Sequence, residues 1–456
     1  MSERPAGGLS SRLRESAYFA FHAVTGSNLG RVYRGFLAED ATRSAYLAVP
    51  ERLSALLRHA AHAVPHYAEQ LDGMDDEIAR DPVAALRSLP VLTKDDVRED
   101  FDRLCSPDLA DRDTYEQTSG GSSGEPLRLI QDRHFRSHDH AIQLLISSWT
   151  GWRPGEPELM ILGSDRDIRE NTLGLRAEVA NRLLRRSYVN AFRMSPEAMR
   201  ACLRLLDRKQ PRLIRAYSQS IYDLATFARQ EGIDVAPQQA ILTTAGMLYP
   251  FMRERIESAF DCRVQDQYGS REVSGIAAGC GEGEGLHVLP WMCFVEVVDE
   301  EGQNVEPGAD GRLLVTSLCN YAMPLIRYEI GDRAALLADD APACACGRGG
   351  QRLVHLSGRI IDTFKASDGS LVNGEYFTHL LYFRNAIKKF QVVQTDRERV
   401  LFRLVLGREL SGEEKDEIAA GTRETMGPEC RVDFETVEEI EPSPSGKYRY
   451  TISECR

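Results

Sequence analysis

Between residue 115 and about residue 290, short apolar runs alternate with segments whose apolar residues recur at helical spacing. The runs are residues 158–162, 212–215, 240–243 and 262–265, and an amphipathic stretch at 251–260 separates the last two. This alternation of strands and helices predicts a layered α/β domain, because each helix must bury its apolar stripe against a sheet. No other pattern in the chain restricts the fold as strongly.

The N-terminal flank of this region has a helical pattern. Residues 1–115 are rich in Ala, Leu, Arg and Glu, and Leu53, Leu56 and Leu57 recur at i, i+3 and i+4. Thr93 precedes a polar segment and is expected to cap a helix. We therefore expect a helical lead-in to the main domain.

The sequence pattern on the C-terminal side of this region changes twice. After residue 290 the pattern is mostly β, with expected strands at 294–298 and 311–316 around a turn at 299–302. The last hundred residues predict a separate α+β unit, with a boundary near Arg359. Its expected elements are strands at 389–394 and 400–406, a polar helix at 412–425, and a segment at 431–437.

Composition restricts the class of protein. A chain of 456 residues is too long for one ordinary core, so two or three domains are expected. The net charge of −13 argues against nucleic acid as a partner, although a small anionic nucleotide needs only a local positive site. Without an apolar run of signal-peptide or membrane-spanning length, we expect a cytoplasmic protein with no membrane partner.

Five short motifs then follow one another in the chain, at residues 118–126, 266–272, 331–333, 357–359 and 444–449. They supply a flexible phosphate loop, a carboxylate for a metal, a carboxylate for a ribose, an arginine, and a lysine near the end of the sequence. In the first, small residues would let backbone N–H groups surround phosphate oxygens. These loop residues are Ser119, Gly120, Gly121, Ser122, Ser123 and Gly124. Together the motifs indicate activation of an acid with ATP.

The first motif permits two further interpretations. It contains Gly-x-Ser-x-Gly, which would make Ser122 the nucleophile of a serine hydrolase if a strand led into it and a helix followed at once. Pro126 follows four residues later, and residues 127–131 look extended. A plain flexible Gly/Ser loop is the second possibility.

The ordered set resembles the adenylate-forming ligases (the acyl/aryl-CoA synthetase superfamily), and within them the phenylacetate–CoA ligase-like branch. The resemblance implies an N-terminal adenylation domain over residues 1–358, with layered α/β subdomains and a β-rich portion, whose residues 1–115 are the helical lead-in. It also implies a small mobile α+β C-terminal domain over residues 359–456. The expected fold class is thus α/β with a small α+β domain.

The resemblance also assigns roles to single residues. Tyr268 would stack on adenine, Glu272 would hold Mg²⁺, Asp332 would bind the ribose hydroxyls, and Arg359 would precede the hinge. Lys447 would bridge the substrate carboxylate and the α-phosphate and so stabilise developing charge. Besides the loop 119–124, the expected nucleotide-binding residues are Ala245, Gly246, Met247, Gln267, Tyr268, Gly269, Ser270, Asp332 and Arg359, and the expected catalytic residues are Lys447, Glu272 and Arg359.

An acyl pocket is expected beside the nucleotide. Its candidate residues are Tyr217, Ser218, Ala245, Gly246, Tyr268 and Gly269. Small residues beside tyrosines would make a flat slot, which suits an aromatic ring. Members of the branch activate aryl acids, often in ring catabolism or in secondary metabolite biosynthesis.

Three cysteines and one histidine form a candidate zinc site. Cys280, His287, Cys344 and Cys346 supply three thiolates and one imidazole, a closed set for structural Zn²⁺. Some phenylacetate–CoA ligase-like proteins carry such a set. Cys293 is a possible substitute, but its apolar surroundings favour a core position. A group of unrelated reduced cysteines would give the same pattern.

We therefore expect an AMP-forming acid–thiol ligase that converts an aryl acid to an aryl-AMP and transfers it to coenzyme A. The expected cofactors are ATP, Mg²⁺, coenzyme A as co-substrate and structural Zn²⁺. A related possibility keeps the adenylation but transfers the acyl group to a carrier-protein thiol or to an amine or hydroxyl of a second molecule. Two different classes of protein also fit parts of the sequence, namely a serine hydrolase that uses Ser122 and a zinc protein that binds without catalysis.

Overall fold

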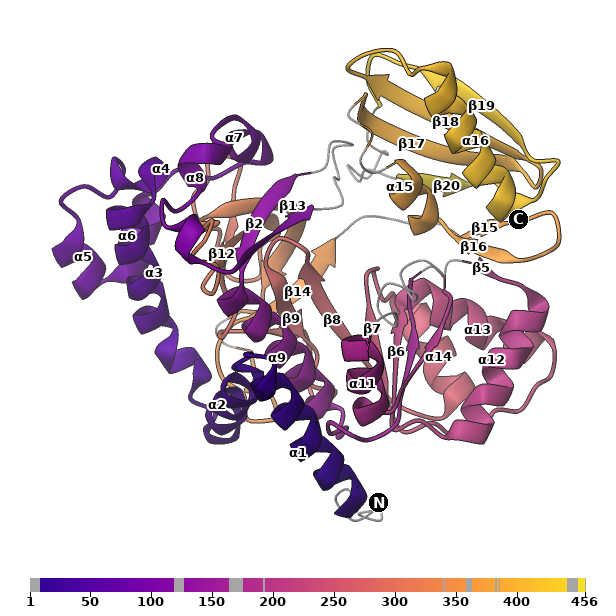
Figure 1. Ribbon diagram of the computed structural model, residues 1–456, viewed down its shortest axis with the longest axis horizontal. Coiled ribbons are helices and arrows are strands. Elements are labelled where there is room, and N and C mark those ends of the chain that lie inside the picture. Colours follow the sequence, from indigo (N-terminus) through magenta and orange to yellow (C-terminus); the bar gives the residue numbers. More distant parts are fainter. Residues whose placement is uncertain are drawn as a thin grey trace.

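The computed structural model describes residues 9–118, 127–163, 175–191, 193–338, 341–357, 363–381, 384, 386–440 and 450–455. Figure 1 shows a group of N-terminal helices, a long central sheet covered by helices, and a small C-terminal unit. These three parts correspond to the helical, alternating and α+β patterns of the sequence. The predicted fold class is confirmed.

The N-terminal part is helical as expected. Its elements are α1 (Leu9–Val24), α2 (Leu29–Thr42), the 3-10 helix η1 (Ala45–Ala48), α3 (Val49–Ala63), α4 (Pro65–Ala68), α5 (Asp75–Arg80), α6 (Pro82–Ser88), α7 (Lys94–Glu99), α8 (Phe101–Leu104) and the 3-10 helix η2 (Leu109–Asp111). Leu53, Leu56 and Leu57 are fully buried on one side of α3. Thr93 caps α7 in a capping box with Asp96, which satisfies the first N–H groups of the helix.

One half of the central sheet is parallel. Its strands are β3 (Glu158–Ile161), β4 (Arg186–Val189), β6 (Leu213–Tyr217), β7 (Ile241–Thr244) and β8 (Val264–Ser270), in the order β4-β3-β6-β7-β8. Four of these strands coincide with the predicted apolar runs, and α14 (Pro250–Phe260) coincides with the predicted amphipathic stretch. The carboxyl ends of the five strands therefore lie along one edge.

Helices cover both faces of this parallel half. Leu213 and Leu242 pack in one core with α1, α2 and α9 (Arg133–Trp149). Ile214 and Ile241 pack in another with α12 (Pro196–Lys209), α13 (Ser218–Gln230) and α14. Successive strand residues thus enter opposite cores, as the period of two requires. A further helix, α11 (Leu175–Leu184), precedes β4.

The other half of the sheet is antiparallel. Strand β8 pairs with β9 (Ser274–Ala278), and the sheet continues through β10 (Leu286–Val288), β14 (Arg352–Ser357), β13 (Tyr328–Leu336), β12 (Gly311–Ser317) and β11 (Cys293–Val298). The whole sheet has 11 strands. A separate hairpin, β1 (Thr114–Thr118) and β2 (Arg128–Asp132), brackets residues 119–126.

The C-terminal unit has its own core. Strands β17 (Ile387–Asp396), β18 (Arg399–Leu406), β19 (Arg431–Thr436) and β20 (Thr451–Ser453) form a sheet in the order β19-β18-β17-β20, together with α15 (Glu375–Leu381) and α16 (Gly412–Met426). The core residues of this unit all lie between Phe364 and Tyr450. The predicted boundary between residues 358 and 359 lies outside the described residues.

One small sheet joins the C-terminal unit to the rest of the chain. The hairpin β15 (Thr363–Lys365) and β16 (Leu371–Asn373) pairs with β5 (Arg193–Met194), in the order β15-β16-β5. Figure 1 shows this sheet between the C-terminal unit and the helices α12 and α13. Of the helices described, none is both long and apolar enough to span a membrane.

A core mutation tests whether the C-terminal unit is an independent folding unit. Phe402 is fully buried, and its ring stacks on that of Phe434 at 5.5 Å between centroids. We expect Phe402→Ala to destabilise this unit by about 3–5 kcal/mol, through lost burial and a cavity. Hydrogen-exchange mass spectrometry should show faster exchange across residues 387–436 and unchanged exchange across 158–270.

The matched control is the neighbouring Arg403→Ala, which removes a partly exposed ion pair with Glu435 and should cost less than about 1 kcal/mol. Faster exchange across the whole chain in Phe402→Ala would mean that the two parts unfold together.

Candidate functional site

Two candidate nucleotide residues from distant parts of the sequence meet at the centre of the sheet. Tyr268 lies near the end of β8, and its hydroxyl donates a hydrogen bond of 2.6 Å to Oδ2 of Asp332, on β13. Glu272 lies in the turn after β8 and is buried, and its Oε1 accepts a long bond of 3.5 Å from the hydroxyl of Tyr328. The structure therefore brings Tyr268, Asp332 and Glu272 into one region, although Tyr268 and Asp332 are 64 residues apart in the chain.

The turn that carries these groups depends on a close approach of two strands. A side chain at Gly269 would collide with the backbone carbonyl of Ser274 on β9, so only glycine fits. Ser270 Oγ accepts a hydrogen bond of 3.4 Å from the Val273 N–H, and Gln131 Nε2 donates one of 2.9 Å to the Arg271 carbonyl. The turn is thereby fixed both within itself and from β2.

The candidate acyl-pocket residues lie at the same edge of the sheet. Tyr217 ends β6, and Ser218 begins α13 and donates a hydrogen bond of 3.0 Å to the Gly246 carbonyl. Ala245 follows β7 in the left-handed region, with φ of 60°. Ala245 and Gly246 are exposed, whereas Met247 is half-buried. These residues therefore line up with the Tyr268 turn along the carboxyl edge of β6, β7 and β8.

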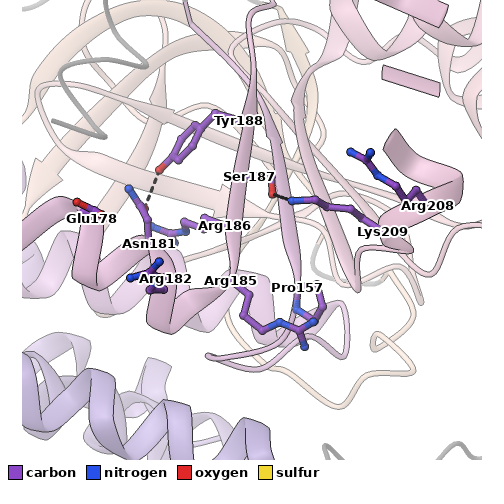
Figure 2. A pocket seen from close by; sticks show the side chains of 10 residues that line it. All are labelled: Pro157, Glu178, Asn181, Arg182, Arg185, Arg186, Ser187, Tyr188, Arg208 and Lys209. Carbon is purple, nitrogen blue, oxygen red and sulfur yellow. Dashed lines mark hydrogen bonds between the residues drawn. The ribbon is translucent and has the colours of Figure 1, made fainter. Parts of the chain in front are cut away.

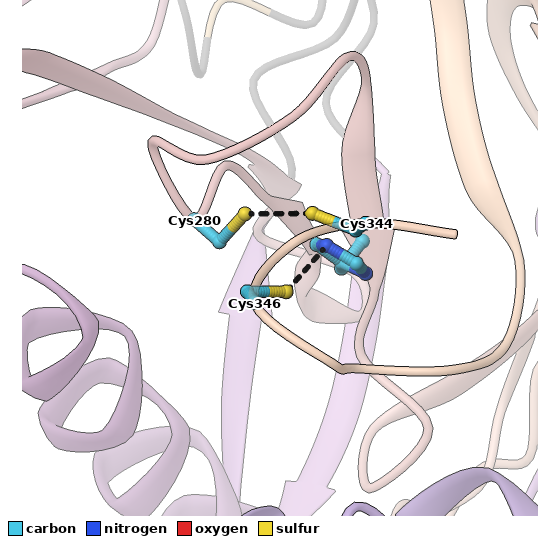
Figure 3. A group of neighbouring side chains, drawn as sticks. Cys280, Cys344 and Cys346 are labelled. Carbon is cyan, nitrogen blue, oxygen red and sulfur yellow. Dashed lines mark hydrogen bonds between the residues drawn. The ribbon is translucent and has the colours of Figure 1, made fainter. Parts of the chain in front are cut away.

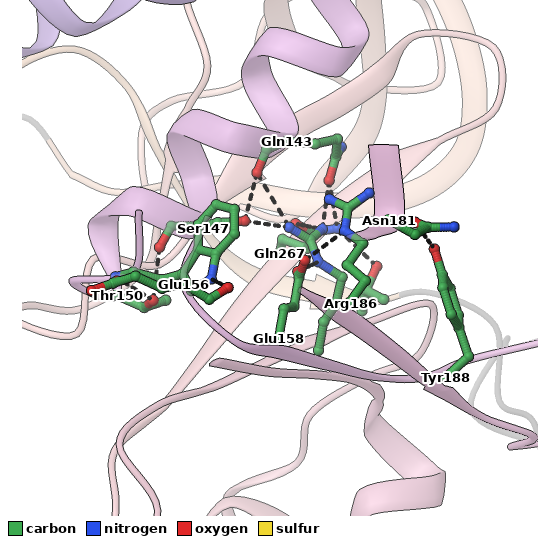
Figure 4. Close-up of polar contacts among 12 residues, drawn as sticks. Gln143, Ser147, Thr150, Glu156, Glu158, Asn181, Arg186, Tyr188 and Gln267 are labelled. Carbon is green, nitrogen blue, oxygen red and sulfur yellow. Dashed lines mark hydrogen bonds and ion pairs between the residues drawn. The ribbon is translucent and has the colours of Figure 1, made fainter. Parts of the chain in front are cut away.

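A buried ion network lies beneath this edge (Figure 4). The Glu158 carboxylate is fully buried between Arg186, at 2.6 Å, and Arg215, at 3.6 Å. Arg215 also donates to Gln143 Oε1 at 2.7 Å and to Gln267 Oε1 at 3.3 Å. A buried carboxylate requires such partners, because it loses its hydration.

The network reaches the candidate site through Gln267, which directly precedes Tyr268. Gln267 Nε2 donates to Thr244 Oγ1 at 3.2 Å, which connects the ends of β7 and β8. The roles of Glu158 and Arg215 were not predicted from the sequence. The available signal was a charged residue in a short apolar run, at the first position of residues 158–162 and the last of 212–215.

Asp266 is an acid in β8, the strand that also carries Gln267 and Tyr268. Its Oδ1 accepts a hydrogen bond of 2.8 Å from the Thr243 hydroxyl. Burial raises the pKa of the Asp266 carboxyl to about 7, and the hydrogen bond from Thr243 only partly opposes this shift. Asp266 therefore binds a proton in the folded protein at a pH at which an exposed aspartate is ionised.

Several predicted residues lie outside the described part of the chain. They are the phosphate-loop residues Ser119, Gly120, Gly121, Ser122, Ser123 and Gly124, the pre-hinge Arg359 and the C-terminal Lys447. The loop joins β1 to β2, whose end residues Thr118 and Arg128 are paired. The first described element after Ser122 is the strand β2, which begins at Arg128, whereas a hydrolase nucleophile is followed directly by a helix.

The four candidate zinc ligands converge, and Figure 3 shows how the three cysteines among them face one another. The ligand atoms of Cys280, His287, Cys344 and Cys346 all lie within 4.8 Å of one another. Sγ of Cys280 lies 3.4 Å from Sγ of Cys344, and Sγ of Cys346 lies 3.3 Å from Nε2 of His287. Tetrahedral zinc, with Zn–S of about 2.3 Å and Zn–N of about 2.0 Å, places its ligand atoms roughly 3.5–3.8 Å apart. The donor set thus fits zinc.

The surrounding backbone also suits thiolate ligands. The N–H groups of Glu282 and Arg348 each donate to a cysteine Sγ at 3.4 Å, to Cys280 and Cys346 respectively. A side chain at Gly283 would come within 2.7 Å of Sγ of Cys344, so glycine is required beside the cluster. Cys293 lies apart in the apolar core, as its apolar surroundings in the sequence predicted.

The chain is similar to known proteins over its C-terminal unit and over most of its length. A family model described as the CapK C-terminal domain matches residues 364–454. Protein CapK of Staphylococcus aureus is 24% identical over 82% of this chain and 81% of its own length. Phenylacetate-coenzyme A ligase of Thermus thermophilus is 25% identical over 75% of this chain and 76% of its own length.

Solved structures share the fold. A 2-hydroxyisobutyryl-CoA ligase in complex with 2-HIB-AMP and CoA, in the thioesterification state, aligns with a TM-score of 0.56 at 21% identity, over 90% of each chain. The same enzyme in the postadenylation state with R3-HIB-AMP aligns with a TM-score of 0.54 at 21% identity, over 90% of this chain and 89% of that one.

Metal analysis tests the zinc site. We expect the purified chain to contain one zinc ion, and Cys346→Ser to lose it and to lower the free energy of unfolding by several kcal/mol, on the order expected when a structural metal is lost. The matched control is Cys455→Ser, which removes a cysteine outside the cluster. Equal zinc content and stability in both variants would contradict a structural role.

The raised pKa of Asp266 predicts a pH dependence of stability. Between about pH 4 and pH 7 the folded state holds a proton that the unfolded state has released, so the free energy of unfolding falls as pH rises, by up to about 1.4 kcal/mol per pH unit. Above the folded pKa this contribution is constant. Asp266→Asn should remove it, because the amide does not titrate.

Urea unfolding of the protein and the variant at pH 5, 6, 7 and 8 measures this difference. Asp261→Asn, at an exposed position, controls for the loss of a carboxylate in general. Identical slopes for Asp266→Asn and the unmodified protein would show that Asp266 titrates as an ordinary acid.

Proposed function

Because the chain belongs to the adenylate-forming superfamily, in its phenylacetate–CoA ligase-like branch, we propose that it activates a carboxylic acid with ATP and transfers the acyl group to coenzyme A. The observation that supports this most directly is the contact between Tyr268 and Asp332, together with the position of Glu272 in the turn that follows β8. These are the residues to which the resemblance gives adenine, ribose and Mg²⁺. They lie together at the carboxyl edge of parallel strands, where α/β sheets bind nucleotides.

In the first step, a carboxylate oxygen of the acid attacks the α-phosphorus of ATP. The bond to the β-phosphate oxygen breaks, which gives an acyl-AMP and pyrophosphate. Residues 119–124 would hold the phosphates, and Lys447 would stabilise the charge that develops between the carboxylate and the α-phosphate. Asp332 would fix the ribose, so that the α-phosphorus is held in line with the attacking oxygen.

Glu272 has the properties of a magnesium ligand. It is a buried carboxylate in the turn after β8. Its hydrogen bond from the Tyr328 hydroxyl is long, at 3.5 Å, so its oxygens can still accept a cation. Mg²⁺ accepts one carboxylate together with phosphate oxygens and retained waters, and when bound it would neutralise phosphate charge.

In the second step, the thiol of coenzyme A attacks the acyl carbon and AMP leaves. We propose that residues 359–456 rotate relative to residues 1–358 between the steps, and so withdraw Lys447 and admit the thiol. The separate core of the C-terminal unit supports such a rigid-body movement. The small sheet formed by β5 and β16 would stabilise one of the two orientations.

The proposed substrate is an aryl acid. Ala245 and Gly246 are small and exposed, and they follow β7 at the edge where β6 ends with Tyr217 and β8 carries Tyr268. Small residues beside tyrosines would suit a flat substrate. The match of the C-terminal unit to the CapK model leaves other acceptors open, namely a carrier-protein thiol or an amine or hydroxyl of a second molecule. Zinc, by this proposal, has a structural role, because its four protein ligands leave no open position.

ATP–pyrophosphate exchange tests the first step. We expect exchange with a subset of benzoic, hydroxybenzoic, aminobenzoic and phenylacetic acids, and weaker exchange with 2-hydroxyisobutyric acid. Lys447→Ala should lower the exchange rate by about 10²–10³-fold, through the loss of transition-state charge stabilisation. Lys415→Ala, an exposed lysine of α16, is the matched control.

The second step provides a further test of the same variant. With synthetic aryl-AMP and coenzyme A, Lys447→Ala should form thioester at nearly the unmodified rate, because Lys447 acts only in adenylation. Exchange with the aliphatic acid alone would contradict the aryl pocket. Labelling by a fluorophosphonate probe that is lost in Ser122→Ala, without any exchange, would favour the hydrolase.

A further inference from the structure

A cationic cavity lies at the opposite edge of the parallel sheet. It has a volume of about 730 Å³ and is formed by α11, the start of β4 and the end of α12 (Figure 2). The residues that enter it precede the strands, whereas the candidate nucleotide residues follow them. Strands β3 and β4 have four residues each and run parallel, so about 13 Å of sheet separates the two edges.

The cavity is strongly basic, although the chain as a whole is acidic. Its lining includes Arg182, Arg185, Arg186, Arg208 and Lys209, against the single carboxylate of Glu178. The chain carries a net charge of −13, so this local excess is not a consequence of composition. Cations gathered in one concave site repel one another, and an anion relieves that repulsion.

Among the described residues, most of these charges lack a counterion. Arg186 is neutralised by buried Glu158. Within the described part of the chain, the other four cations form no ion pair, and Lys209 donates only to the Ser187 hydroxyl, at 2.8 Å. Tyr188 and Ser187 add hydroxyl groups to the lining. The positive charges and hydroxyl groups of the cavity thus suit a ligand with several negative charges.

Three arginines of the lining lie in or beside the turn between α11 and β4. Arg185 occupies the turn between α11 and β4 with φ of 53°, a conformation that glycine adopts without strain. Its N–H donates to the Arg182 carbonyl at 3.3 Å, and its carbonyl accepts from the Glu158 N–H at 3.3 Å. Figure 2 shows Arg182 and Arg186 near Asn181, Arg185 next to Pro157, and Lys209 pointing from α12 to Ser187.

We propose that this cavity binds a small phosphorylated molecule with at least two anionic groups, at a site separate from the adenylation site. Guanidinium groups offer planar pairs of donors that match phosphate oxygens, and four of the five cations are arginines. A volume of about 730 Å³ is in the range of pockets that enclose a whole small molecule, such as a sugar bisphosphate.

Calorimetric titration of the full chain with fructose 1,6-bisphosphate tests the proposal. The titration is run both without and with a non-hydrolysable ATP analogue and Mg²⁺. Binding that the analogue abolishes and that the cavity variants leave intact would belong to the adenylation site and would contradict the proposal. We expect binding of one molecule per chain, which weakens with added salt. Arg182→Gln and Arg185→Gln should each weaken binding about tenfold. Arg204→Gln, an exposed position one turn before Arg208 on α12, should leave it unchanged.

Circular dichroism will show whether the changes at Arg182 or Arg185 disturb folding. If they do, Arg208→Gln and Lys209→Gln test the same cavity from the α12 side. Arg186 is left intact because it pairs with buried Glu158. The proposal is wrong if millimolar fructose 1,6-bisphosphate does not bind, or if Arg204→Gln weakens binding as much as the cavity variants do. Equal or tighter binding of citrate would overturn the assignment to phosphorylated ligands. None of these outcomes depends on adenylation, so this result is separable from the exchange experiment.

Discussion

Strand β8 pairs with β7 in parallel and with β9 in antiparallel orientation, and the candidate site lies where this change occurs. Its first residues, up to Asp266, are in register with β7, and from Gln267 onward it is in register with β9. The parallel half brings the ends of β6 and β7 to this point, and the antiparallel half brings β13 with Asp332. Because Gly269 alone permits the close approach to β9, the geometry of the site depends on one position without a side chain.

Two groups of buried polar contacts hold the elements around this junction. The ion network of Glu158, Arg186 and Arg215 connects β3, β4 and β6 to α9 and then to Gln267 of β8. On the other side, Arg327 is buried against Glu296 at 3.1 Å and donates to the Leu89 carbonyl at 2.5 Å. Arg327 directly precedes β13, so the same strand that carries Asp332 also anchors the N-terminal helices.

The cysteine cluster adds a third attachment. It joins the loop after β9 and the start of β10 to residues 344–346, and Arg348 then contacts α2 through a bidentate pair with Asp40 at 2.7 and 2.8 Å. The Arg348 guanidinium also lies 4.0 Å from the ring centre of Trp149, at the end of α9. A metal at this point would therefore connect the antiparallel half of the sheet to the helices that cover the parallel half.

The sequence by itself determined the elements that have a strong local signal. The apolar runs of β3, β6, β7 and β8, the stripe of α3 and the cap at Thr93 depend on periodicity and on contacts within a few residues, so they could be predicted. The candidate residues Tyr268, Glu272 and Asp332 and the four candidate zinc ligands were predicted from residue type and order. Only the tertiary structure decided which of these residues meet. The contact between Tyr268 and Asp332 spans 64 residues, and it follows from the order of the strands in the sheet and not from the spacing of the motifs in the sequence. The Glu158–Arg215 network and the cationic cavity were not found in the sequence, because a charge in a short apolar run shows neither its partner nor the edge of the sheet at which it lies.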